Sequence, residues 1–108
     1  MIRKKKRIQK ENDLLARVYD LILNKETLDD ERSKLIEFKN EIENGKDFEK
    51  QVMKLSRDLR LLALSKAKDK KNLSLEVGKL YMDISSTGFL KEELGRGIVS
   101  LSGVIGNS

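Results

Sequence analysis

The side chains that could carry chemistry in this 108-residue chain are carboxylates, lysines and two tyrosines, because it contains no histidine and no cysteine. Histidine is the commonest general base and the commonest metal ligand. Its absence, with that of cysteine, excludes a Ser-His-Asp triad, an imidazole zinc site, a disulfide and a thiol nucleophile. No paired-carboxylate motif replaces them. We therefore expect a protein that is not an enzyme and that needs no cofactor and no metal.

Two groups of basic residues could bind an anionic partner. Residues 1–10 carry six cations and no acid, and residues 45–72 carry nine cations against four acids. Each basic residue near an anionic membrane surface contributes about 1 kcal/mol. The alternatives are a solubilising N-terminal arm and a solvated connector whose lysines complement a helix dipole. The connector residues that are candidates for membrane or partner electrostatics are Lys66, Lys68, Lys70 and Lys71.

The segment of residues 87–108 combines five of the seven glycines with regularly spaced apolar residues. Steps of four and three place those apolar residues on one face of a helix. Because Gly95, Gly97 and Gly103 together oppose a helix by about 3 kcal/mol, we predict a marginal fifth helix that forms only when it packs. This tail stripe is either a partner-binding element or a segment that covers the core, and it consists of Leu90, Leu94, Ile98, Leu101 and Ile105.

Four amphipathic helices are predicted to position these groups. The first spans roughly residues 10–25, with Asn12 or Asp13 as a cap, and the second begins at an N-cap of Asp29 or Asp30. The second ends near Asn44, because the following Gly45 can adopt a left-handed conformation. Asp47 and Ser74 are predicted to cap the third and fourth helices.

Each predicted helix has one apolar face. Leu61 and Leu64 widen the face of the third helix, which indicates contact with more than one neighbour. The remaining core candidates are Leu14, Leu15, Val18, Leu21, Ile22, Leu35, Phe38, Ile42, Phe48, Val52, Leu55, Leu59, Leu62, Val77, Leu80, Tyr81 and Ile84.

Short connectors between four such helices predict an all-α, antiparallel up-and-down four-helix bundle with a C-terminal tail or marginal fifth helix. We divide the chain into a basic arm (1–9), the bundle (10–86) and a glycine-rich apolar segment (87–108). In this topology the arm and the lysine connector lie at opposite ends. No apolar run is long enough to span a bilayer, and none follows the basic arm as it would in a secretory signal.

Three stretches resemble the immunity proteins of pediocin-like, enterocin A type bacteriocins. Residues 14–22 (LLARVYDLI) resemble the first helix of that family, and residues 48–64 resemble its third. The closest likeness is the passage from Leu61 to Ser85, which contains LLALSK, LSLEV and LY followed by IS. The resemblance covers roughly residues 11–86.

The resemblance implies a cytoplasmic protein, partly peripheral to the inner face of the membrane, that protects its host from a membrane-permeabilising peptide. It also implies the partner, because family members lock the complex of the bacteriocin with its receptor, the membrane part of the mannose phosphotransferase permease. The C-terminal half of the family is held to govern which bacteriocin is recognised. We accordingly expect a monomer that binds this complex and, transiently, the inner membrane surface, but not nucleic acid.

Two other functions are compatible with the composition. The net charge of +5 and the basic arm would suit a small nucleic-acid-binding regulator, but no recognition helix is evident. A helical protein-interaction module is the second alternative.

Overall fold

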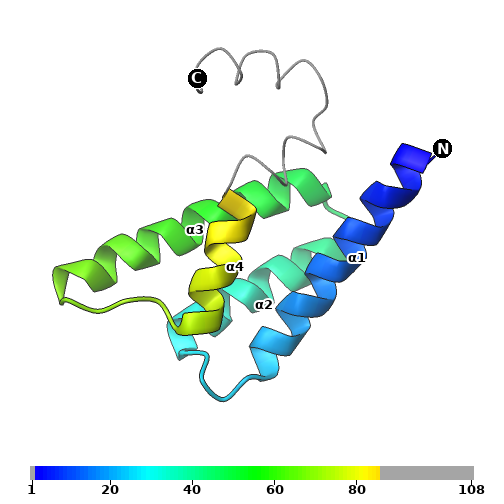
Figure 1. The fold of residues 1–108 in the computed structure, drawn as a ribbon. Coiled ribbons are helices and arrows are strands. Elements are labelled where there is room, and N and C mark those ends of the chain that lie inside the picture. The colour runs from blue at the N-terminus through cyan, green and yellow to red at the C-terminus, as the bar shows by residue number, and fades with distance from the viewer. Residues whose placement is uncertain (1, 86–108) are drawn as a thin grey trace, which may run out of the picture.

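The computed structural model describes the backbone of residues 2–85 and the side chains of residues 8–85. This part of the chain forms four helices and no strand (Figure 1). Each helix packs against the next along the chain, which confirms the predicted all-α four-helix bundle. The helices are α1 (Ile2–Leu23), α2 (Asp29–Glu43), α3 (Phe48–Lys68) and α4 (Leu75–Ser85).

A single apolar core joins the four helices. Apart from Leu61 and Leu64, every core candidate is either buried or packed against the buried cluster, so the helical periodicity identified most of the inward faces correctly. The rings of Phe38 and Phe48 meet edge to face, with centroids 5.8 Å apart, and this contact joins α2 to α3. The buried apolar residues are Leu14, Val18, Leu21, Leu35, Phe38, Val52, Leu55, Leu59, Val77, Leu80 and Ile84.

Two residues predicted to widen the core face of α3 point to solvent instead. Leu61 is 56% exposed and Leu64 is 54% exposed. α3 does pack against both α2 and α4, but it does so through the stripe that contains Val52, Leu55 and Leu59. The prediction that Leu61 and Leu64 mediate contact with a second neighbour is therefore wrong within the described residues.

The turn between α2 and α3 forms as predicted. Gly45 has a φ of +83°, its N–H donates to the Ile42 carbonyl, and the Lys46 N–H donates to the Glu41 carbonyl. These two bonds form a Schellman motif, which ends α2. Asp47 then accepts a hydrogen bond from the Lys50 N–H at 3.0 Å and so caps the start of α3.

Other helix ends differ from the predictions. α1 begins at Ile2, so the basic segment continues the helix, and Asn12 and Asp13 lie within it rather than capping it. α2 starts after Leu28, whose backbone is extended, rather than after Asp29 or Asp30. An apolar residue can occupy this N-cap position because the Glu31 carboxylate bonds its N–H.

The start of α1 and the α3–α4 connector lie at opposite ends of the molecule (Figure 1). The connector leads back to the first turn of α2, where α4 begins. This arrangement of the backbone agrees with the predicted topology.

Candidate interaction surfaces

The lysine connector is the first candidate surface, and one of its four lysines forms an ion pair within the chain. The Lys66 Nζ lies 3.1 Å from the Asp30 Oδ2, and the Lys66 side chain is only 13% exposed. Lys66 therefore links the end of α3 to the start of α2. Its candidate role in membrane or partner electrostatics stays a prediction.

The other three lysines lie at an exposed helix end. α3 continues through Lys68, and Lys68, Lys70 and Lys71 are all exposed. Lys70 adopts a φ of +60°, which lets the Lys70 N–H bond the Ala67 carbonyl and the Lys71 N–H bond the Lys66 carbonyl. This is a second Schellman motif with lysine in the position that usually holds glycine. The three lysines thus lie in the last turn of α3 or within three residues of its end, where positive charge favours the negative end of the helix dipole.

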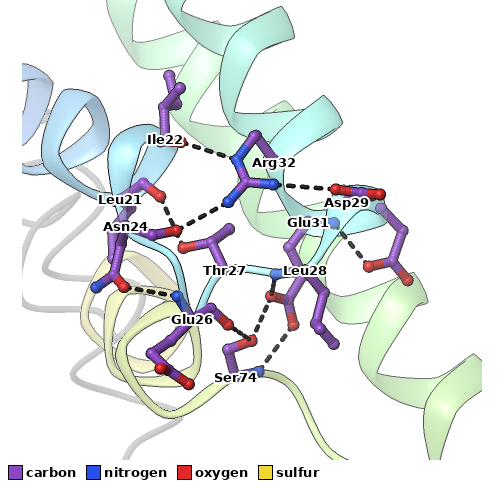
Figure 2. Close-up of polar contacts among 11 residues, drawn as sticks. Leu21, Ile22, Asn24, Glu26, Thr27, Leu28, Asp29, Glu31, Arg32 and Ser74 are labelled. Carbon is purple, nitrogen blue, oxygen red and sulfur yellow. Dashed lines mark hydrogen bonds and ion pairs between the residues drawn. The ribbon is translucent and has the colours of Figure 1, made fainter.

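A buried carboxylate holds the connector in place, as Figure 2 shows. Glu31 has no exposed surface. Its Oε1 accepts the Leu28 N–H at 2.9 Å, and its Oε2 accepts the Ser74 N–H at 2.8 Å. The Ser74 hydroxyl lies 2.6 Å from Glu31 Oε1 and 2.9 Å from the Glu26 carbonyl oxygen. Ser74 stands directly before α4 as predicted, but its hydroxyl bonds the α1–α2 loop and α2 rather than an amide of α4.

The same junction closes the end of α1. Arg32 donates through Nε to the Ile22 carbonyl and through Nη2 to the Asn24 carbonyl, both at 2.8 Å (Figure 2). The buried Thr27 hydroxyl donates to the Leu21 carbonyl at 2.7 Å. These side chains satisfy carbonyls that the last turn of a helix leaves without partners. We call Thr27, Glu31, Arg32 and Ser74 the loop junction.

A small open pocket of about 160 Å³ lies between α1 and α4. The ion pair of Arg17 with Asp83, at 2.8 Å, forms part of its wall. Ligand sites for small molecules usually measure 300–1,000 Å³, so this pocket is small for a cofactor. The remaining lining residues are Lys10, Asp13, Leu14 and Ile84.

A comparison with known protein families shows to which family this chain belongs. The model of the bacteriocin immunity protein family matches residues 9–88, which include almost all of the four helices and the whole loop junction. The chain belongs to this family. The matched family is the enterocin A type of immunity protein, the same type that the sequence resembles. No curated protein and no solved structure matches the chain significantly.

In this immunity-family chain, the loop junction joins the α1–α2 loop, α2 and the α3–α4 connector. The hydrogen-bonding partners of Glu31 are groups of its own chain, and they hold its carboxylate in the interior. Among residues 8–85 no cluster of three or more acidic side chains could hold a metal ion. None of the described helices is both long and apolar enough to cross a bilayer.

The predicted partner-binding stripe of this immunity-family chain belongs to the C-terminal segment. Its residues, from Leu90 to Ile105, lie beyond the family match and outside the described part of the chain. Of the predicted site residues, the structure therefore places only the four connector lysines, and it separates Lys66 from the other three.

Sequence reasoning missed the loop junction, although one signal for it exists. Glu31 precedes Leu35 by four residues and Phe38 by seven, which puts it in register with the buried face of α2. A carboxylate at a position that belongs to an apolar stripe has two explanations. Either the buried part of the stripe ends before that residue, or the carboxylate is itself buried and has hydrogen-bonding partners. An acidic residue in the first turn of a helix also suits the positive end of the helix dipole, and the partner that shows otherwise, Ser74, lies 43 residues away.

Two further ionisable contacts shift pKa values at the surface of the bundle. The Tyr19 hydroxyl donates a hydrogen bond to Glu43, which lowers the pKa of that carboxyl and raises the pKa of the tyrosine. Within α3, a hydrogen bond to Asp58 at 2.9 Å, supported by the Glu37 carboxylate of α2 at 3.3 Å, raises the pKa of Lys54. Both contacts hold neighbouring helices together, and neither lies in a cleft.

Proposed function

We propose that this chain protects its cell from a pore-forming, pediocin-like bacteriocin by binding rather than by catalysis. Its target in this proposal is the bacteriocin–receptor complex at the cytoplasmic side of the membrane, and the receptor is the membrane part of the mannose phosphotransferase permease. The observation that carries the proposal is the family match over residues 9–88. The absence of histidine and cysteine from the chain supports a binding role.

In this mechanism the four helices are a rigid scaffold and the tail selects the partner. The tail stripe of Leu90, Leu94, Ile98, Leu101 and Ile105 orders against the receptor–peptide complex and contributes apolar burial. A weak helix that orders only on binding loses conformational entropy at that moment, so its affinity depends on the apolar contacts that it makes. The exposed lysines Lys68, Lys70 and Lys71 assist approach to the anionic inner leaflet, and Lys66 holds their helix end in place.

The test is protection of bacteriocin-sensitive cells that express the chain. We expect survival when the cells are challenged with one or a few members of a panel of pediocin-like peptides. Sensitivity to every member of the panel, with the protein present at normal levels, would contradict immunity to this class of peptide.

The role of the tail is tested by the double variant Leu94→Asp, Ile98→Asp. Two charges on the stripe should abolish protection, because carboxylates cannot be buried against an apolar partner without a large cost. The matched control, Ser100→Asp with Ser102→Asp, adds the same charge to the same segment but leaves the stripe apolar. Equal protection by both variants at equal protein levels would remove the tail from the mechanism.

A further inference from the structure

The solvent face of α3 differs from every other described helix face, because it is both cationic and apolar. It lies opposite the buried stripe of Val52, Leu55 and Leu59, since the helical repeat of 3.6 residues turns these positions about half a circle away. All of its residues are exposed, and none is acidic. We call this the outer face of α3, and it consists of Lys50, Met53, Arg57, Arg60, Leu61, Leu64 and Lys68.

Among the described residues, none of its four cations has an ion-pair partner, whereas cations on α2 and α4 do. On α2, Arg32, Lys34 and Lys39 each form an ion pair with an acidic residue of the same helix. On α4, Lys79 pairs with Glu76. Even on α3, the cations outside this face are paired, as Lys54 and Lys66 show. None of the outer-face cations forms an ion pair with another described residue, so their charges are available to an anionic partner.

Three large apolar side chains lie among these cations. Met53 is 52% exposed, and Leu61 and Leu64 are exposed to a similar degree. They alternate with arginine and lysine along about 27 Å of helix, given a rise of 1.5 Å for each of the 18 steps from Lys50 to Lys68. Long basic side chains can extend past such apolar neighbours and place their charges at the level of phosphates.

We propose that the outer face of α3 binds the surface of an anionic lipid bilayer. The face is convex and belongs to a single helix, so it fits a planar partner better than a partner that must be held in a groove. Basic residues interleaved with leucine and methionine are the composition of helices that lie in a membrane interface. Lys70 and Lys71, which are exposed just beyond the end of α3, add positive charge near the C-terminal end of this face.

This inference concerns the scaffold and does not depend on the tail or on which bacteriocin is countered. It predicts that the purified full-length chain co-sediments with vesicles of phosphatidylglycerol and phosphatidylcholine at low ionic strength. Binding to vesicles of phosphatidylcholine alone should be at least tenfold weaker. Absence of binding to the anionic vesicles would overturn the proposal, and so would retention on polyglutamate without vesicle binding, which would assign the face to an acidic protein.

A charge-reversal pair tests the face itself. Arg57→Glu with Arg60→Glu should weaken binding to anionic vesicles at least tenfold. Lys25→Glu with Lys46→Glu changes the net charge equally at exposed positions in loops and should weaken binding less than threefold. Equal losses in the two variants would show a response to net charge alone and would overturn the assignment to α3. Circular dichroism establishes that both variants are folded.

Tryptophan fluorescence tests whether the apolar residues enter the interface. The chain has no tryptophan, so a single introduced residue reports on its own surroundings. The emission of Leu64→Trp should shift to shorter wavelength when anionic vesicles are added. Leu23→Trp, at an 81% exposed position at the end of α1, should keep its emission wavelength. A shift of both or of neither would contradict insertion through α3. Protection assays on intact cells remain a separate measurement, so failure here leaves the proposed immunity function standing.

Discussion

At the scale of single residues, the most consequential side chain is a carboxylate that never reaches solvent. Glu31 accepts hydrogen bonds from the Leu28 N–H, the Ser74 N–H and the Ser74 hydroxyl. A buried carboxylate without such donors would be strongly unfavourable. Its bonds join the α1–α2 loop, α2 and the α3–α4 connector, so one residue positions two loops.

Replacing this carboxylate should cost more than replacing any exposed one. We expect Glu31→Ala to lower the free energy of unfolding by about 3 kcal/mol, because it leaves two backbone N–H groups without their acceptors. Urea denaturation measures this value. Glu76→Ala is the control, since its ion pair with Lys79 is half-exposed and should contribute less than about 1 kcal/mol. Equal effects of the two variants would show that Glu31 does not support the junction.

The contact between Tyr19 and Glu43 predicts a response to pH. The hydrogen bond from Tyr19 keeps the pKa of Glu43 below its ordinary value of 4.5, so the Tyr19→Phe variant should show a higher carboxyl pKa in an NMR titration. A carboxyl whose pKa is lowered by folding stabilises the folded state above its unfolded pKa, and this contribution disappears as the pH falls through the folded pKa. The variant should therefore be less stable than the native chain at pH 7 and equal to it in strong acid. An unchanged Glu43 titration would contradict the contact.

At the scale of the elements, two Schellman motifs end α2 and α3 with different residues in the left-handed position. Gly45 carries a φ of +83° and Lys70 a φ of +60°. Glycine adopts this conformation at low cost, whereas a side chain with a Cβ is strained in it. The two helix ends are otherwise alike, which makes them a matched pair.

Exchanging the residue types at these positions should therefore have opposite effects. We expect Gly45→Ala to destabilise the protein by about 1 kcal/mol through backbone strain alone, because no atom lies within 4 Å of the added Cβ. Lys70→Gly should stabilise it by roughly 0.5–1 kcal/mol. Thermal unfolding measures both changes in stability. A change of the same sign in the two variants would show that backbone strain at positive φ does not determine the stability of these turns.

The helix ends also show which structural features local sequence patterns can predict. Gly45 and Asp47 are residue types with one dominant local role, and the turn that they form was predicted correctly. The expected connector starts at Lys66, whereas α3 continues through Lys68, because a lysine in the left-handed position leaves no signal in the sequence. The inward faces were predictable because helical periodicity depends only on local spacing. Burial of Glu31 was not, because it depends on Ser74, and no local pattern joins the two.

At the scale of the whole molecule, the helices share one core whose faces divide sharply between inside and outside. On α3, Leu59 has no exposed surface, while Leu64 is more than half exposed five residues later. The same residue type thus serves the core at one position and lies on the outer face at the other.

This division predicts unequal costs for the same substitution on one helix. Leu59→Ala should lower the free energy of unfolding by roughly 2–5 kcal/mol, which is the range for truncation of a buried leucine. Leu64→Ala should change it by no more than about 0.5 kcal/mol. Denaturant titration of the two variants checks the difference, and a comparable loss from Leu64→Ala would mean that this side chain is covered.

The bonds between Glu31 and Ser74 also bear on the order in which the chain folds. They join residues 43 positions apart, whereas α1 with α2 and α2 with α3 are neighbours that can pair after short loop closures. The carboxylate is shut off from water only when the connector arrives, so its desolvation and the docking of α4 form a single late event. Loss of this contact should then appear mainly as faster unfolding, with the refolding rate almost unchanged. The loop junction is thus expected to slow the unfolding of a protein whose other helix contacts form mainly between neighbours in the sequence.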